Sequence, residues 1–173
     1  MAEEKTNKMR EIEIEKVVLS AGAVEDELEK AVKLLKIITG RNVIKTKSKK
    51  RIPDFGIRPG LEIGCKVTLR GEKAEEILKK LFQAIDNKLN TKQINDEDFS
   101  FGIEEYIEIP GIEYQRDIGM KGINVTIVFK RKGKRVELRK IKKGKLPRRQ
   151  RVTKQEIVGY LKNKFNTNIE EEK

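Results

Sequence analysis

The stretch Ile63-Gly-Cys-Lys-Val-Thr-Leu-Arg-Gly71 carries the clearest strand pattern in the 173-residue chain. Its apolar residues alternate with polar ones, Cys65, Val67 and Leu69 against Lys66, Thr68 and Arg70. Successive side chains of a strand point to opposite faces of its sheet. One face of this strand is therefore apolar, and the other carries two cations and a hydroxyl group. This pattern is typical of an antiparallel sheet that is buried on one side only.

The same alternation, together with helical spacing, predicts the elements on either side of this strand. Further strands are expected at 12–22, from Val43-Ile44 onward, near 103–109 and at 123–129, with 135–139 as a hairpin partner. Helices are expected at 24–38 with Gly40 as the cap, at 72–89, and after the capping-box sequence Thr153-Lys-Gln-Glu156. The predicted fold class is α+β, an antiparallel-rich sheet with helices packed on one face.

We expect one domain at 11–165, and it includes a basic extension at 130–151. A polar leader at 1–10 precedes this domain. The acidic tail at 166–173 is expected to be disordered, because it is short and mostly polar.

The positive charge of the chain is concentrated in two segments. The net charge is +12, and residues 130–151 account for all of it with 13 Lys/Arg and one acid. Residues 41–58 add seven basic residues against Asp54. Concentrated charge of this kind releases counterions from a phosphate backbone, which is the main sequence-independent source of nucleic-acid affinity. We therefore expect the open sheet face and the loops to be available to RNA, a merely solvated basic surface being the alternative.

Several classes of protein are disfavoured by what the sequence lacks. There is no histidine, and Cys65 is the only cysteine, so neither a disulfide within the chain nor a cysteine zinc site can form. No Walker phosphate loop is present. We expect no enzyme activity, no metal, no cofactor and no small-molecule substrate. The N-terminus does not resemble a signal peptide and no apolar run could span a bilayer, so we expect a cytoplasmic protein with no membrane partner.

Three basic features are candidate RNA contacts, and each has a simpler interpretation. The stripe Lys66, Thr68 and Arg70 could meet successive sugars and phosphates, but taken alone it fits a solvated sheet face slightly better. In the segment 45–58, a base could stack on Phe55, or Phe55 could belong to the core. The run 130–151 indicates a polyanionic partner without saying which one.

A set of short motifs, taken in order along the chain, resembles a known family. They are Ile38-Thr-Gly-Arg41, Lys45-Thr-Lys-Ser-Lys49, Phe55-Gly-Ile-Arg58, the opening stretch 63–71, Phe99-Ser-Phe-Gly-Ile103 and Ile118-Gly-Met-Lys-Gly122. Together they resemble ribosomal protein five of the large subunit over roughly residues 10–165. The basic C-terminal region with Pro147-Arg148-Arg149 resembles the archaeal version of that family.

The resemblance implies a structural protein of the ribosome that binds 5S rRNA in the central protuberance, touches the tRNA in the peptidyl site and helps bridge to ribosomal protein thirteen of the small subunit. For 5S rRNA, it points to Ser20, Gly22, Lys45, Lys47, Lys49, Lys66, Thr68 and Arg70. For the tRNA-contacting loop, it points to Lys50, Arg51, Phe55, Gly56, Ile57 and Arg58. Additional rRNA contacts are expected from Arg131, Lys134, Arg135, Arg148, Arg149 and Arg151.

Two other functions stay open at this point. A non-ribosomal RNA-binding module, such as an RNA chaperone or a translation factor, would share the basic surface. A small enzyme acting on an anionic substrate is the other, although the absence of histidine and of a phosphate loop argues against it.

Overall fold

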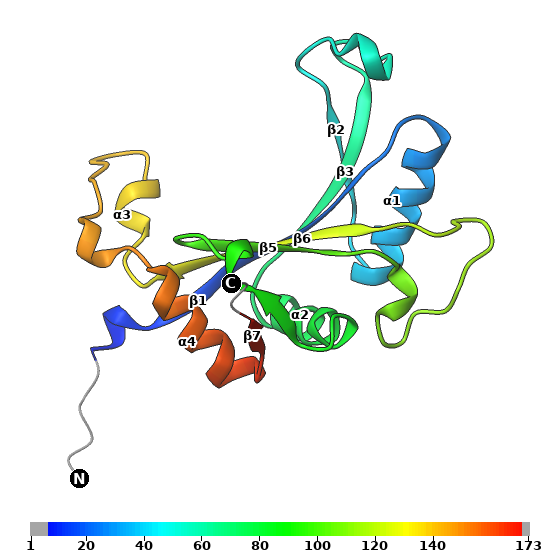
Figure 1. Ribbon diagram of the computed structural model, residues 1–173. Coiled ribbons are helices and arrows are strands. Elements are labelled where there is room, and N and C mark those ends of the chain that lie inside the picture. Colours follow the sequence, from blue (N-terminus) through cyan, green and yellow to red (C-terminus); the bar gives the residue numbers. More distant parts are fainter. Residues whose placement is uncertain (1–6, 171–173) are drawn as a thin grey trace.

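The computed structural model describes residues 7–170 and contains one five-stranded sheet (Figure 1). Its strands are β1 (Ile12–Gly22), β2 (Ile44–Lys47), β3 (Glu62–Leu69), β5 (Asp98–Ile103) and β6 (Ile123–Arg131). They lie in the order β2-β3-β1-β6-β5, and every neighbouring pair is antiparallel. The helices are α1 (Asp26–Thr39), α2 (Glu72–Ala84), α3 (Arg135–Leu138) and α4 (Lys154–Phe165). The expected α+β class with an antiparallel sheet is confirmed.

Short elements complete the described chain. The strands β4 (Lys88–Asn90) and β7 (Asn168–Glu170) form a separate parallel pair. Single 3-10 turns occur at Lys8–Arg10, Pro53–Phe55, Thr91–Gln93, Tyr106–Glu108 and Arg148–Gln150.

One face of the large sheet is buried across its four longer strands. Leu19 of β1 lies between Val67 of β3 and Val125 of β6, and Phe101 of β5 adjoins Val125 in the same row. All four side chains are buried. The helices α1, α2 and α4 contribute residues such as Leu34, Leu78 and Leu161 to the same core cluster. Burial of each large apolar side chain contributes roughly 1.5–3 kcal/mol, so this face holds the fold together.

Aromatic rings join α4 and α2 to the sheet. Phe82 stacks against Phe99 and Phe101, and the Phe129 ring meets Tyr160 of α4 edge-on at 5.6 Å between centroids. The predicted capping box opens α4, because Thr153 and Glu156 satisfy each other's backbone N–H groups. The predicted cap of α1 is also confirmed, since Gly40 adopts the left-handed conformation and its N–H reaches the Lys36 carbonyl.

The prediction of a strand near 103–109 is wrong. The strand ends at Ile103, and a 3-10 turn follows at Tyr106–Glu108. Tyr106 and Ile109 are both buried, and a spacing of three residues suits a 3-10 turn and not the alternation of a strand. The Tyr106 hydroxyl accepts a hydrogen bond from the Gln115 N–H at 2.9 Å, which fixes the loop that leads to β6.

Three further expectations need correction. The segment 135–139 is not a hairpin strand, because Arg135–Leu138 form α3 just after the turn at Gly133. Helix α2 ends at Ala84 and does not reach 89, since Asp86 and Asn87 have positive φ angles that end the helix. Asn168–Glu170 of the tail pair with β4 and are not disordered. Residues 1–6 of the leader and 171–173 of the tail lie outside the described residues.

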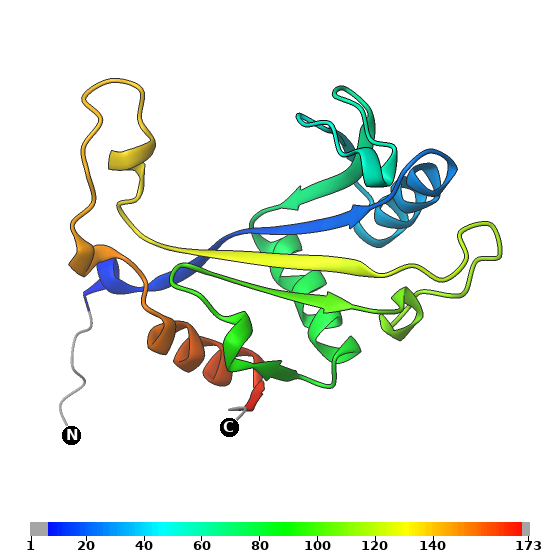
Figure 2. The same ribbon diagram turned by 45° about the horizontal axis from the view of Figure 1, so that its top comes forward.

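Two segments extend away from the sheet at its opposite ends (Figures 1 and 2). One is the hairpin of β2 and β3. We call the connection 48–61 between these two strands the hairpin tip. The other is the connection 132–153 between β6 and α4, which includes α3 and which we call the arm. In both views the hairpin tip and the arm rise on the side of the sheet away from α2 and α4.

Candidate nucleic-acid interface

The face of the sheet opposite the core carries a grid of polar side chains. Strand pairing sets Lys66, Ser20 and Asn124 side by side in one row across β3, β1 and β6. The next row holds Thr68, Val18 and Thr126, and Ser100 of β5 extends it beyond Thr126. Lys66, Thr68, Asn124 and Ser100 are exposed to solvent. We call these two rows the open face.

This geometry suits contacts with a nucleic-acid backbone. Neighbouring strands lie about 4.8 Å apart, and residues on one face of a strand repeat every 6.6–6.8 Å or so. Lysine, hydroxyl and amide groups at these spacings can donate to phosphate oxygens and to ribose hydroxyls, the groups that position a protein on RNA. Backbone hydrogen bonds hold the strands, so the donors are placed before any partner arrives.

The structure separates Lys45 and Lys47 from the open face. Lys45 pairs with Cys65, whose side chain is buried, so Lys45 lies on the α1 side of the sheet. There its ammonium group meets Glu62 at 3.0 Å, and this hydrogen bond raises the pKa of Lys45. Lys47 lines the same shallow cleft as Lys45, next to acidic residues at the start of α1. Of the residues expected to bind 5S rRNA, Ser20, Lys66 and Thr68 lie together on the open face.

Three other residues expected to bind 5S rRNA lie at the edges of the open face, namely Gly22, Lys49 and Arg70. Gly22 ends β1 opposite Gly64, and no side chain projects from either residue. A Cβ at Gly64 would come within 3.1 Å of Thr46 Oγ1 and 3.2 Å of the Ala21 carbonyl, so a glycine is needed there for the strands to approach. Lys49 begins the hairpin tip, and Arg70 follows the last residue of β3.

The hairpin tip is ordered by its own backbone. Ile52 and Ile57 exchange two N–H···O bonds of 3.0 Å, and Gly56 closes the turn with a bond to Pro53. Phe55 stands at the end of the tip with 76% of its surface exposed, so it does not belong to the core. Lys50, Arg51 and Arg58 are exposed beside it. Ile57 is buried at the bridge, which makes it a support of the tip and unavailable as a contact.

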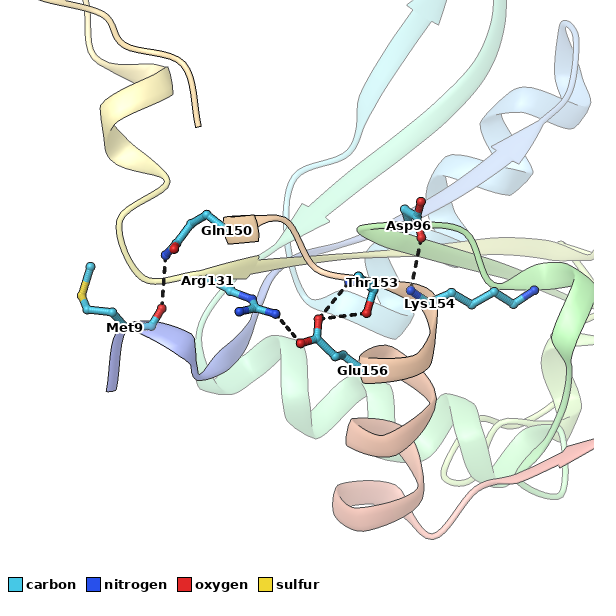
Figure 3. Close-up of polar contacts among 7 residues, drawn as sticks. All are labelled: Met9, Asp96, Arg131, Gln150, Thr153, Lys154 and Glu156. Atoms are coloured by element: carbon cyan, nitrogen blue, oxygen red, sulfur yellow. Dashed lines mark hydrogen bonds and ion pairs between the residues drawn. The ribbon is translucent and has the colours of Figure 1, made fainter. Parts of the chain in front are cut away.

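Two cations expected to touch rRNA, Arg131 and Lys134, form ion pairs within the chain, and Figure 3 shows the pair made by Arg131. Arg131 is only 8% exposed, and its guanidinium group donates a hydrogen bond to Glu156 of α4. Lys134 donates to Glu15 of β1 at 2.9 Å and lies 3.9 Å from Glu97. Both side chains therefore hold the base of the arm within the chain.

Other contacts fix the same region from both ends of the arm. Lys132 meets Glu11 at 2.8 Å and Glu13 at 3.5 Å. The Gln150 amide donates to the Met9 carbonyl at 3.3 Å (Figure 3) and to the Lys132 carbonyl at 3.3 Å. The base of the arm is thus tied to β1 and to the turn before it.

The carboxylates that anchor the arm have lowered pKa values. Hydrogen bonding and the charge of Lys132 lower the pKa of Glu11. Burial raises the pKa of Glu15, but the hydrogen bond and charge of Lys134 outweigh this, and the net shift is downward. Burial likewise raises the pKa of Glu156, and hydrogen bonds from Arg131 and Thr153 reverse it. These groups stay ionised at neutral pH, so the arm is anchored by charge pairs.

Beyond its base the arm is exposed. Arg135, Arg148 and Arg149 form no ion pair among the described residues, and Arg151 is 58% exposed at 3.8 Å from Glu97. Leu138 and Ile141 are also largely exposed, at 68% and 79%. The arm therefore presents cations together with apolar side chains that contact little of the described chain.

Sequence reasoning missed Ser100 as a candidate contact, and it included Lys130 only as part of the basic run 130–151. Alternation within β6 could have found Lys130, because it follows Asn124, Thr126 and Val128 on the same face. Ser100 was hidden because β5 was expected further along the chain. Within residues 7–170 there is no cluster of acidic, cysteine or histidine side chains able to hold a metal ion. No helix in this part of the chain is long and apolar enough to cross a membrane.

Comparison with known families decides which class of nucleic-acid-binding protein is present. The sequence model described as ribosomal protein L5 matches residues 7–58, and a second model, described as the C-terminus of the same ribosomal family, matches residues 62–158. The chain belongs to the ribosomal protein L5 family. The boundary between the two matches falls in the hairpin, so β1 and β2 come from the first and β3, β5 and β6 from the second.

Similar L5 proteins cover nearly the whole chain. The large ribosomal subunit protein uL5 of Nanoarchaeum equitans is 46% identical over 164 residues, which cover 93% of this chain and 97% of that protein. The uL5 proteins of Sulfurisphaera tokodaii and Methanosphaera stadtmanae are 42% and 40% identical and cover 99% and 95% of this chain, and 99% of each of those proteins. The expected archaeal type is confirmed.

L5 membership makes the chain a structural constituent of the large ribosomal subunit and not an enzyme. Binding to ribosomal RNA is typical of the family. The two rival functions, a non-ribosomal module and a small enzyme, are thereby excluded.

Proposed function

We propose that the chain binds 5S rRNA through the open face and so attaches it in the central protuberance of the large subunit. The observation that carries this proposal is the pair of polar rows across β3, β1, β6 and β5. Their side chains are fixed by strand pairing and lie on the side of the sheet away from the core. Lys66 supplies the cation, and Thr68, Thr126 and Ser100 supply hydroxyl donors to the sugar-phosphate backbone.

Two neighbouring lysines offer a matched test of this surface. Lys66→Gln removes a cation from the open face, and Lys45→Gln removes one from the opposite face of the adjacent strand. With labelled 5S rRNA, Lys66→Gln should weaken binding by about 5–10-fold and reduce the salt slope by about one. Lys45→Gln should stay within about twofold of the unmodified chain. Equal losses in the two variants would contradict the proposal.

The salt dependence of the unmodified chain tests the electrostatic part separately. Each phosphate neutralised by a cation adds about −0.7 to −0.9 to the slope of log affinity against log salt. We expect affinity to fall steeply between about 50 and 400 mM salt. A flat dependence would show that the cations of the open face and the arm do not meet phosphates.

We also propose that the hairpin tip contacts the tRNA in the peptidyl site. Phe55 is the support for this, because an exposed aromatic ring flanked by Arg51 and Arg58 can stack on a base or ribose while the arginines meet phosphates. The bonds between Ile52 and Ile57 hold the ring away from the body of the protein.

Phe55→Ser in reconstituted ribosomes should reduce retention of tRNA in the peptidyl site and leave 5S rRNA binding unchanged. Tyr114→Ser, which also replaces an exposed aromatic residue, is the matched control. Deletion of residues 53–58 should have the same selectivity as Phe55→Ser. Loss of 5S rRNA binding in parallel with tRNA retention would show that the tip and the open face do not act separately.

The remaining parts of the proposed function are contacts of the arm with large-subunit rRNA and a bridge to ribosomal protein thirteen of the small subunit. Exposed Arg148 and Arg149 support the first. Crosslinking of assembled ribosomes tests the second, and recovery of no crosslink to that protein would refute it.

A further inference from the structure

A cleft lies where the arm leaves the sheet, next to the open face. Its volume is about 450 Å³. Cations from three elements line it, namely Arg70 after β3, Lys130 in β6 and Arg135 in α3. Leu138 forms an apolar part of the wall. The strand order of the sheet and the start of the arm bring these residues together, although 65 positions separate the first from the last.

Two acidic residues, Glu13 and Glu15, also line the cleft, and each lies beside a lysine. Glu15 accepts a hydrogen bond from Lys134 at 2.9 Å, and Glu13 lies 3.5 Å from Lys132. Arg131, which reaches the same cleft, is paired with Glu156. Lys130 adds to the lowering of the pKa of Glu15 by its charge, although it forms no ion pair with it in the described structure.

This arrangement leaves three cations close together without an ion pair among the described residues. Like charges gathered at one place repel each other, and an anion in the cleft would relieve this repulsion. Guanidinium groups bind phosphate oxygens with paired hydrogen bonds, and an ammonium group adds a point charge. A phosphate group is therefore the ligand that fits the donors of Arg70, Lys130 and Arg135.

The position of the cleft identifies the source of the phosphate. Arg70 is two residues beyond Thr68, so the cleft continues the open face along β3. On its far side begins the exposed part of the arm. A strand of RNA bound along the open face would reach the cleft, and the wall formed by Leu138 could cover the apolar face of a ribose.

We propose that this cleft is a phosphate-binding site in which Arg70, Lys130 and Arg135 hold one backbone phosphate of the RNA bound to the open face. The inference rests on the proposed binding of 5S rRNA. It goes further by assigning the sheet and the arm to the same RNA strand, with the cleft as the joint between them.

A double-mutant cycle with labelled 5S rRNA tests this site. The substitutions Arg70→Gln, Lys130→Gln and Arg135→Gln should each weaken binding by about 5–10-fold. Because two arginines share one phosphate, the Arg70→Gln/Arg135→Gln double variant should lose about 10–20-fold, less than the roughly 25–100-fold product of independent sites. Lys140→Gln, on the arm but outside the cleft, is the control and should couple with neither arginine. Urea denaturation verifies that each variant is folded.

The outcomes separate the two proposals. If the losses in affinity multiply in the double variant, the two arginines do not share one phosphate. The proposal is also wrong if the unmodified chain binds 5S rRNA and the cleft variants bind it as well as Lys140→Gln does. Failure of the unmodified chain to bind 5S rRNA would refute the proposed function and this inference with it. A second readout is phosphate ethylation interference, in which Arg70→Gln and Arg135→Gln should abolish interference at the same position of the RNA.

Discussion

Replacement of Glu156 should detach α4 from the end of the sheet, because one carboxylate serves two partners there. Its Oε1 accepts from the buried Arg131, and its Oε2 accepts from the Thr153 N–H at 3.0 Å and hydroxyl at 3.1 Å (Figure 3). Glu156→Ala removes both acceptors. It leaves a guanidinium charge that is 8% exposed without its only carboxylate partner among the described residues.

The expected loss can be estimated from these contacts. Removal of one partner from a fully buried ion pair costs about 3–5 kcal/mol. Glu156 is 40% exposed, so water can reach the vacated site, and we reduce this part to about 2 kcal/mol. The lost hydrogen bonds from the Thr153 N–H and hydroxyl to Glu156 add about 1 kcal/mol. Glu156→Ala should therefore lower the free energy of unfolding by about 3 kcal/mol.

Urea denaturation followed by circular dichroism measures this change. Glu156→Gln keeps an acceptor for Thr153 and loses the charge, so it should cost about half as much. Gln155→Ala, at an exposed neighbour on the same helix, is the control and should change stability by less than about 0.5 kcal/mol. The reasoning is refuted if Glu156→Ala stays as close to the unmodified chain as this control does.

Three more predictions concern packing and pH. Gly64→Ala should lower the free energy of unfolding by about 1–3 kcal/mol, because the new Cβ meets the Ala21 carbonyl at 3.2 Å. In the control Gly102→Ala the new Cβ meets only Asn124 at 3.6 Å, so stability should hardly change. Urea denaturation midpoints measure both changes. Phe99→Ala should cost about 3–5 kcal/mol, since Phe99 is fully buried among aromatic rings, and the exposed Phe55→Ala should cost almost nothing in the same assay. Glu11, Glu15 and Glu156 have pKa values lowered by pairing with the base of the arm, so their contribution is present above the unfolded value of about 4.3 and is lost as pH falls through the lower folded values. Unfolding measured from pH 6 downward should show constant support from these pairs to about pH 5 and a decline below about pH 4, with a smaller decline in Glu156→Gln.

The strands and helices with long, regular patterns were predictable from sequence. Cys65, Val67 and Leu69 face the core as their alternation indicates, and Thr153 with Glu156 opens α4. Short segments were not predictable, because a pattern of three or four residues is compatible with a strand, a turn or a helix. Arg135–Leu138 contains two apolar residues two apart, which suits a strand, yet the turn at Gly133 starts a helix.

The candidate site was predictable only in part, because charge pairs between distant segments leave no local pattern. Nothing near Lys134 in the sequence reveals that Glu15, more than a hundred residues earlier, will accept its hydrogen bond. Composition counts all basic residues equally, but in the folded chain some form ion pairs and others stay exposed. Those at the base of the arm hold the structure, and those beyond it and on the open face are left for a partner.

The central position of β1 has a consequence for how the chain folds during synthesis. β1 is the first strand to be made, yet its two neighbours are β3 and β6, so its second edge stays unpaired until residues up to Arg131 have left the ribosome. Pairing over such separations is slow, since a long loop must close before any contact is gained. An unpaired, largely apolar central strand can meanwhile join to other chains. The nascent chain should therefore depend on a chaperone or on an early RNA contact until β6 closes the sheet.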